Sequence, residues 1–166
     1  MSDIEIGLNV TNTRTQAEGP EFRVGTTAAT TDTAGVVREY IYVQATAAPT
    51  AAGYIMIIHP TTFAADMITN TNALAGIGWA VGSPLAVIPT AGYGWLQIYG
   101  PGTFRAAAAV TAGIQLNTSG AAGALSNTLT AATTAQVAGI GNPSTQGGSG
   151  VWPCWLNYPF VLKAQQ

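Results

Sequence analysis

Charged residues and cysteine are scarce in this chain of 166 residues. Asp, Glu, Lys and Arg make up 7% of the sequence, whereas an ordinary soluble domain has roughly 25%. The single cysteine, Cys154, excludes an internal disulfide. With one histidine, His59, and carboxylates mostly confined to the N-terminal part, no spacing typical of metal ligands is present. We therefore expect neither a metal nor another cofactor.

Basic runs and long apolar runs are missing as well. The net charge is −2 and no basic run could neutralise a phosphate backbone, so nucleic acid is not an expected partner. Gly, Pro or a polar residue interrupts every window of about 18 residues, the length that spans a membrane. The start, Met1 to Glu5, lacks the features of a signal peptide. We expect a protein without a membrane segment that is made and kept in the cytoplasm.

Few side chains are available for catalysis. Proton transfer or nucleophilic attack needs a base or nucleophile held beside a partner group. His59 ends one apolar stretch and Cys154 lies inside another, which favours structural roles for both. A pairing of the two in space stays open. We expect that the protein is not an enzyme.

Gly, Ala and Thr are abundant instead, and the mean hydropathy is +0.28. The charges crowd into the first 39 residues, and beyond them only Asp66, Arg105 and Lys163 are charged. Clusters of aliphatic and aromatic residues favour a packed fold over disorder. The surface must then consist largely of uncharged polar and small residues. Such a surface loses little hydration energy when a partner covers it, which suits a protein of a large assembly.

Two parts of the chain differ in amino-acid composition. Residues 1–35 are rich in Thr with little to bury, and we expect an extended N-terminal arm there, ordered mainly by what it contacts. In the remainder, β-branched and aromatic stretches alternate with Gly or Pro. The predicted strands lie at residues 36–44, 54–59, 78–82, 85–88, 94–99, 110–116, 136–140 and 151–162. One helix is predicted at residues 61–75, with Thr61 or Thr62 as its N-cap.

The fold class follows from this organisation. Short strands separated by turn residues are typical of antiparallel barrels and sandwiches. We predict a mainly β protein: a small antiparallel β-barrel, β-tulip-like or sandwich domain at residues 36–166, an extended arm at residues 1–35, and at most one short helix.

The tryptophans allow two interpretations. They are Trp79, Trp95, Trp152 and Trp155. Buried aromatic residues dominate the energetics of cores and subunit interfaces, and this interpretation is favoured. Exposed tryptophans also stack on sugars, although only Asn157 and Arg105 offer polar groups nearby. A carbohydrate-binding role therefore stays open.

Residues 92–125 carry a recognisable pattern. An aromatic strand from Gly92 to Gly100 is followed by Val-Thr-Ala-Gly-Ile-Gln-Leu at residues 110–116 and by Ala-Gly-Ala-Leu at residues 122–125. Val-Ala-Gly-Ile follows at residues 137–140. This pattern resembles the small head-decoration (capsid cement) proteins of tailed phages. Gly113 and Gly123 would mark tight turns of a barrel hairpin.

The resemblance implies a structural role on a virion. A decoration protein of this kind binds the major capsid protein on the outer surface of an expanded head, as a homo-oligomer expected to be a trimer, and stabilises contacts between capsid subunits. It would be assembled in the host cytoplasm and located on the capsid surface. A carbohydrate- or receptor-binding virion module that uses surface tryptophans is the alternative, and a shell or tail-tube subunit is a weaker third interpretation.

Position and residue type suggest which residues make the contacts. The candidates for capsid contacts are four charged residues of the arm, Arg14, Glu18, Glu21 and Arg23. The candidates for self-association are three aromatic residues near the C-terminus, Trp152, Trp155 and Tyr158. An arm that orders on binding loses entropy, so several subunits per site would be needed for firm attachment.

Overall fold

The computed structural model describes residues 9–48, 51–129 and 133–163. Within these ranges the chain forms ten strands and one helix of six residues, which confirms the prediction of a mainly β fold with at most one short helix. The strands are β1 (Thr27–Thr31), β2 (Val37–Ala45), β3 (Met56–Ile58), β4 (Ala64–Met67), β5 (Val81–Pro84), β6 (Tyr93–Ala106), β7 (Leu116–Thr118), β8 (Ala124–Ser126), β9 (Ala135–Gly141) and β10 (Gly150–Lys163). The helix α1 (Asn70–Ala75) lies between β4 and β5 along the chain.

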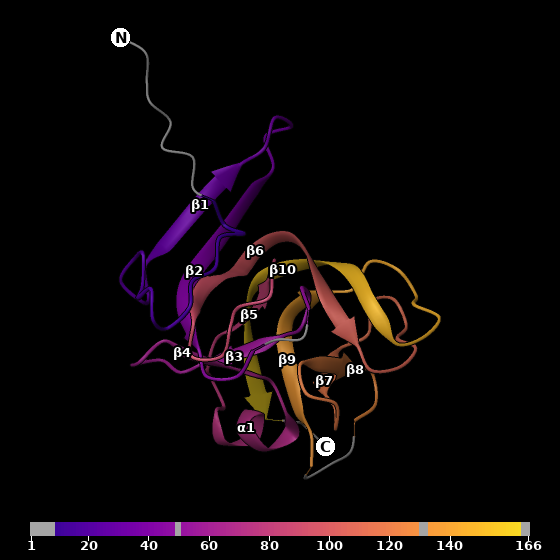
Figure 1. Cartoon of the computed structure of the whole chain (residues 1–166). Helices are drawn as coiled ribbons and strands as arrows, with labels where there is room; N and C mark the ends of the chain where they lie inside the picture. The colour runs from indigo at the N-terminus through magenta and orange to yellow at the C-terminus, as the bar shows by residue number, and fades with distance from the viewer. Residues whose placement is uncertain (1–8, 49–50, 130–132, 164–166) are drawn as a thin grey trace.

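Strand β6 is the centre of the fold (Figure 1). The strand order is β1-β2-β4-β3-β5-β6-β10-β9-β7-β8, and further pairings join β2 to β6 and β6 to β8. The pairings therefore form two rings that share β6. The first ring contains β2, β4, β3, β5 and β6, and the second contains β6, β10, β9, β7 and β8. Most pairings are antiparallel, whereas the short β2–β4 and β6–β8 pairings are parallel.

A bend at Gly100 allows β6 to serve both rings. Residues 93–99 of β6 pair with β2, and residues 99–106 pair with β10. Gly100 has a φ angle of +90°, which residues with a side chain rarely adopt. A β-carbon at this position would also collide with the backbone carbonyl of Val37 at the start of β2. Glycine is therefore required where the two rings meet.

Each ring contributes an apolar core, and β3 lies between the two. Met56 and Ile58 belong to the core of the first ring, whereas Ile57 belongs to the larger core, which also contains residues of the second ring and α1. The larger core includes Phe104 and Leu156, which are fully buried. Burying such a side chain stabilises the fold by roughly 1.5–3 kcal/mol. The strand predicted at residues 54–59 is confirmed over residues 56–58, and β3 is buried on both faces.

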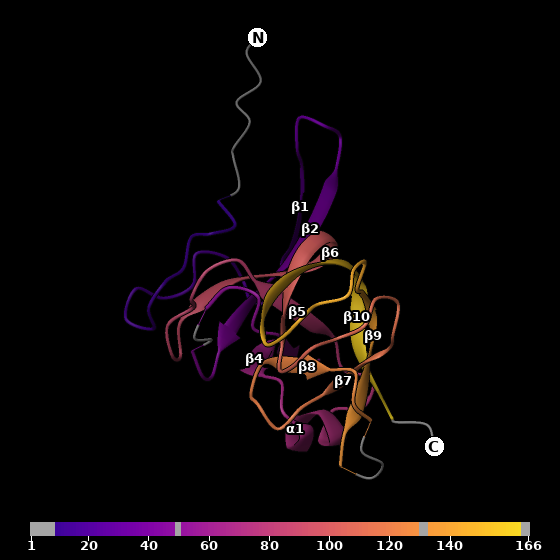
Figure 2. The ribbon, with the colours of Figure 1, turned by 90° about the vertical axis from the view of Figure 1, so that its right-hand side faces the viewer.

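Part of the predicted arm, the segment before β1, lies against the outside of the first ring (Figure 2), whereas residues 27–31 are not an extended arm but strand β1, paired with β2. Phe22 contacts the rings of Tyr42 and Trp95, with centroids 5.4 and 5.2 Å away. Arg14 and Tyr93 exchange two backbone hydrogen bonds of 2.9 and 2.8 Å. The segment before β1 therefore covers an aromatic face of β2 and β6. Residues 1–8 of the predicted arm lie outside the described residues.

The helix is shorter than the sequence predicted. Residues 64–67 form β4, which pairs with β3 on one side and β2 on the other, and α1 begins only at Asn70. The N-cap is Thr69, whose hydroxyl accepts a hydrogen bond from the Asn72 N–H at 3.2 Å. The Asn72 side chain accepts one from the Thr69 N–H at 2.7 Å and completes a capping box. Pairing on both edges outweighs the local helical preference of residues 64–67.

Other predicted strands also differ from the structure: the one predicted at residues 78–82 lies at residues 81–84 as β5, one is absent and one is shortened. Residues 85–88 are irregular although Ile88 is buried, because Pro84 and Pro89 flank them and proline cannot donate to a strand ladder. Of residues 110–116, only Leu116 belongs to a strand. Val110 forms an isolated bridge with Gln146, and residues 112–113 form a turn in which Gly113 has a φ angle of +69°, as the tight turn predicted there requires.

Strands β1 and β2 form a hairpin that projects from the two rings (Figures 1 and 2). Asp32 stabilises its turn. One carboxylate oxygen accepts hydrogen bonds from the N–H groups of Ala34 and Val36 at 2.9 and 3.0 Å. The other lies 3.0 Å from the guanidinium of Arg38. These contacts lower the pKa of Asp32, and the hydrogen bond from Val36 contributes most.

Acid is therefore expected to loosen the hairpin turn. A carboxyl group whose pKa is lowered by folding stabilises the native state above its ordinary value of 3.8, and this contribution is lost as the pH falls through the folded value. The exchange protection of the Val36 amide should fall a few-fold in acid, relative to amides of the cores. Asp32→Asn should lower that protection already at neutral pH and remove the acid dependence. Equal protection in both proteins would contradict this role of Asp32.

Candidate interaction surface on strand β10

Strand β10 has one apolar face that the described chain leaves exposed. Inward residues such as Leu156 are buried, whereas the residues between them are open to solvent. The β10 apolar face consists of Val151, Trp155, Tyr158, Phe160 and Leu162, with exposed fractions from 37% to 50%. These are five of the eleven large apolar side chains that are exposed in the described residues. Exposed apolar residues are normal when scattered, but their concentration on one strand marks an interaction surface.

An irregularity in β10 keeps this face continuous. Leu156 is opposite Ile140 and Phe160 is opposite Ala138, so the register shifts between them. Tyr158, within the shift, has a φ angle of +46°, which is rare for a residue with a side chain. Strict alternation would place residues 155 and 158 on opposite faces. The bulge instead brings Tyr158, and the strand after it, to the side of Trp155.

Three aromatic rings form the centre of the surface. Tyr99 of β6 makes an edge contact with Trp155, at a centroid distance of 6.1 Å, and stacks on Tyr158 at 5.2 Å. A hydrogen bond to the carboxylate of Glu39 raises the pKa of the Tyr158 phenol, so this hydroxyl is a donor at neutral pH. Large side chains held by one another lose little conformational entropy when a partner covers them.

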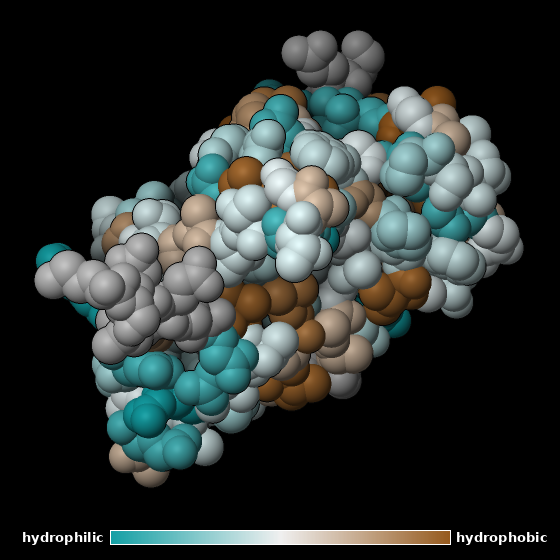
Figure 3. Space-filling view, turned by 90° about the horizontal axis from the view of Figure 1, so that it is seen from above, coloured by the Kyte–Doolittle hydropathy of each residue, from teal (hydrophilic) through white to brown (hydrophobic). Residues whose placement is uncertain are grey.

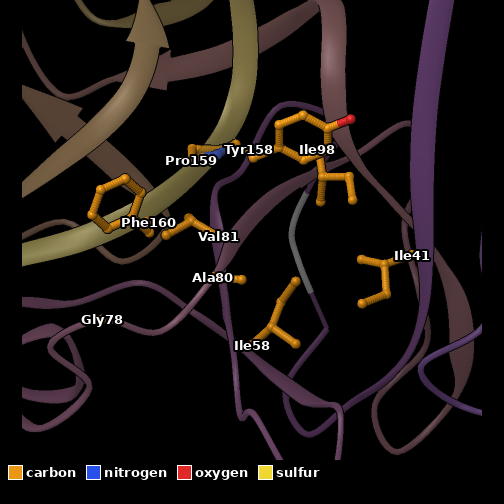
Figure 4. A pocket seen from close by; sticks show the side chains of 9 residues that line it. All are labelled: Ile41, Ile58, Gly78, Ala80, Val81, Ile98, Tyr158, Pro159 and Phe160. Carbon is orange, nitrogen blue, oxygen red and sulfur yellow. The ribbon is translucent and has the colours of Figure 1, made fainter.

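An apolar pocket adjoins the face (Figure 4). It has a volume of about 130 Å³ and lies where the end of β10 runs beside the segment that leads into β5. Its lining residues are Ile41, Ile58, Gly78, Ala80, Val81, Ile98, Tyr158, Pro159 and Phe160. Since Tyr158 and Phe160 belong to both features, the pocket and the face are continuous. The pocket could receive an apolar side chain of a protein partner.

The rest of the visible surface is weakly polar. Seen from above, brown apolar patches lie among white and pale residues, with one group of strongly hydrophilic residues at lower left and others scattered (Figure 3). This pattern agrees with the charged fraction of 7%. Little desolvation of charge would oppose contact with another protein.

The three candidates for self-association do not lie together. Trp155 and Tyr158 belong to the β10 apolar face. Trp152 packs partly buried against the larger core, and its indole N–H donates to the carbonyl of Gly148 at 3.2 Å. It points to the other face because it lies three residues before Trp155 on a regular part of the strand. Trp152 therefore supports the fold and not the surface.

The charged residues proposed for capsid contacts lie in the segment that precedes β1. Arg14 and Glu21 form an exposed ion pair of 4.0 Å, and Glu21 also accepts a hydrogen bond from Asn12. Glu18 accepts hydrogen bonds from the N–H and hydroxyl of Thr15 at 2.7 and 2.8 Å, which lower its pKa. Arg23 is exposed farther along. Three of the four thus have partners within their own segment, which holds them at the surface.

Neither candidate for catalysis lies at this face. Cys154 is buried, and burial raises the pKa of its thiol to about 12, so the reactive thiolate is nearly absent at neutral pH. His59 stacks edge-on against Trp79, with ring centroids 4.6 Å apart. Within the described ranges, no three His, Cys, Asp or Glu side chains gather to hold a metal ion. No helix in those ranges is long and apolar enough to cross a membrane.

Sequence reasoning missed part of the surface. It did not single out Tyr99, Val151, Phe160 or Leu162. A signal was present, since residues 151–162 are apolar at positions that would face both sides of a strand. A strand of this kind is either buried on both faces or part of an interface.

Comparisons of the chain with protein-family models, with curated proteins and with solved structures find no match, so the interpretation of this surface rests on its geometry.

Proposed function

We propose that this chain is a structural virion protein: a decoration, or cement, protein that binds the outside of a tailed-phage head. It attaches as a homo-oligomer, expected to be a trimer, and stabilises contacts between major capsid subunits. It is assembled in the host cytoplasm and located on the capsid surface. The observation that supports this proposal best is the β10 apolar face, since an exposed aromatic surface without reactive groups fits protein association.

In this proposal, one surface makes the contacts between copies and another contacts the capsid. Trp155 and Tyr158, with Tyr99 beside them, supply the apolar contact between copies. Three partly exposed aromatic side chains together offer roughly 300 Å² for burial, and their apolar neighbours add to this. That area is a reasonable core for an interface of standard size. The charged segment at residues 14–23 is left free to meet the capsid.

A non-enzymatic role is part of the proposal. The thiol of Cys154 is shielded in the core, and the imidazole of His59 packs on an indole ring. Acid–base or nucleophilic catalysis needs such groups open to a substrate and paired with each other. The pocket beside Phe160 is lined by apolar side chains, which suit binding better than proton transfer.

The alternative is a carbohydrate- or receptor-binding virion module. Trp155 and Asn157 flank an open hollow together with Gly139 and Gly141, and an indole beside an amide is a combination that can bind a sugar. The aromatic face extends well beyond this hollow along an apolar strand. A sugar would leave most of it exposed, so the protein interface is preferred.

Co-sedimentation tests the proposal. Expanded heads of the phage that encodes this chain, prepared without the protein, should bind the purified protein saturably. The heads with bound protein should then survive heat better than bare heads. Binding to glycans but not to heads would instead support the alternative.

Charge reversal tests which segment meets the capsid. Arg23→Glu should weaken head binding by about tenfold, because a contact between opposite charges on the protein and the capsid becomes a contact between like charges. Lys163→Glu is the matched control, since it reverses an exposed cation at the far end of the chain. Equal losses for the two variants, or none, would rule out the segment before β1 as the contact.

A further inference from the structure

Among the described residues, β1 is the one strand with a neighbouring strand on a single side. Every other strand takes part in one of the two rings and has neighbours on both sides. β1 pairs with β2 alone, and the hairpin that contains it stands clear of the rings (Figures 1 and 2). An open strand edge presents unpaired N–H and C=O groups to any extended chain that approaches it.

The register of the hairpin shows which groups are free. The Tyr42 N–H donates to the carbonyl of Thr26, and the Asp32 N–H donates to that of Val36. In an antiparallel pair, alternate residues direct both backbone groups to the partner strand. Even-numbered residues of β1 therefore face β2. The backbone groups of the odd-numbered residues point away from it, and these residues are Thr27, Ala29 and Thr31.

This edge lacks the usual protections against pairing. Natural proteins block exposed edges with lysine, proline, inward charges or bulges. The sequence of β1 is Thr-Ala-Ala-Thr-Thr, without charge or proline, and its pairing with β2 has no irregularity. Threonine also favours the extended conformation. Within the described part of the chain, the edge is therefore open and able to pair with a further strand.

We propose that β1 pairs with β1 of a second copy, antiparallel, about a two-fold axis at Ala29. Ala29 then lies opposite its own counterpart, and Thr27 lies opposite Thr31. The three outward-facing residues of each strand exchange about six backbone hydrogen bonds, two for each facing pair. The two hairpins become one four-stranded sheet, in the order β2-β1-β1-β2.

A second copy fits this edge better than an unrelated peptide for two reasons. The strand is self-complementary, because small alanine side chains meet at the axis and threonines meet on either side, with no like charges opposed. Antiparallel pairing also places the two sets of rings at opposite ends of the new sheet. Since each hairpin projects from its rings, the bulk of one copy does not obstruct the other (Figure 1).

The contact should be weaker than the one at β10. Hydrogen bonds at an exposed edge replace bonds to water and each contributes little net free energy, and little apolar area is buried. The pairing would form mainly when copies are held close together, as at high concentration or on a common support. It does not depend on capsid binding, so purified protein is sufficient to test it.

Cysteine cross-linking gives the most specific test. The native Cys154 is buried, with a pKa of about 12, so an introduced surface thiol is the reactive one. Ala29→Cys should form a disulfide-linked dimer under mild oxidation, because facing Cα atoms in such a pair are about 5.5 Å apart, within the range for a disulfide. Thr27→Cys is the matched control. It is equally exposed, but its own counterpart would lie about 13 Å away.

The double variant T27C/T31C should cross-link as Ala29→Cys does, because position 27 of one copy lies opposite position 31 of the other. Adding Ala29→Pro to it should reduce the yield by at least fivefold, since proline removes the outward N–H at the axis and leaves the β1–β2 bonds intact. Ala29→Ser retains the N–H and should leave the yield unchanged. Equal cross-linking of Ala29→Cys and Thr27→Cys, or no cross-linking of either Ala29→Cys or the double variant, would overturn the proposal.

Discussion

Trp155→Glu is expected to abolish firm attachment of the protein to phage heads and to dissociate the free oligomer. The indole lies at the centre of the β10 apolar face, in contact with Tyr99. A carboxylate there would be desolvated without a partner, which typically costs several kcal/mol at an interface. Loss of multivalent attachment alone weakens apparent affinity by a factor of about 10² to 10⁴. We therefore expect head binding to fall at least hundred-fold in co-sedimentation.

The fold itself should survive this substitution. Trp155 is 47% exposed, so the free energy of unfolding of the monomer should change by no more than about 1 kcal/mol. Ile114→Glu is the matched control, because Ile114 is also 47% exposed but lies outside the β10 apolar face. Its variant should remain oligomeric. An oligomeric, head-binding Trp155→Glu protein would show that the β10 apolar face is not the contact between copies.

Gly100→Ala is expected to destabilise the fold by about 2–5 kcal/mol. A left-handed conformation costs a residue with a side chain about 1–2 kcal/mol. At Gly100 the added methyl group also meets the carbonyl of Val37 and the side chain of Arg38, so β2 must shift away from β6. Overpacking of this kind adds about 1–3 kcal/mol. Both rings contain β6, so the loss should appear as a lower midpoint for the whole unfolding transition.

Gly35→Ala separates the two contributions. Gly35 in the hairpin turn has a φ angle of +79°, similar to that of Gly100, but nothing lies within 4 Å of the position of its β-carbon. It should therefore lose only the conformational part, about 1–2 kcal/mol. Urea unfolding followed by tryptophan fluorescence gives both values. If the two variants lost equal stability, the close approach of β2 and β6 at Gly100 would have no energetic importance.

The sequence predicted the local elements better than their connections. Strands β2, β9 and β10 were predicted within a few residues, because their aromatic and β-branched residues favour extended backbone in any context. Residues 64–67 were assigned to a helix, since only pairing with distant strands makes them extended. The two rings were not foreseen for the same reason. Their closure depends on a bend at one glycine and on pairings between segments far apart in the chain.

The candidate surface was predicted in part. Trp155 and Tyr158 were chosen by residue type and position, and the structure places both rings in contact with Tyr99. That placement depends on the bulge at Tyr158, which no local pattern indicates. Trp152 was grouped with them for the same reason but faces the other side. The face to which a strand residue points is inferred by counting residues along the strand. One inserted residue moves every later side chain to the opposite face.

The mass of the purified protein in solution tests the central claim most directly, namely that copies of this chain associate through the β10 apolar face. Sedimentation equilibrium at low concentration, where the weaker β1 contact does not form, should show a trimer for the wild-type chain and monomers for Trp155→Glu. A wild-type protein that remains monomeric at the highest concentration, with Trp155 accessible to a soluble fluorescence quencher, would contradict the claim.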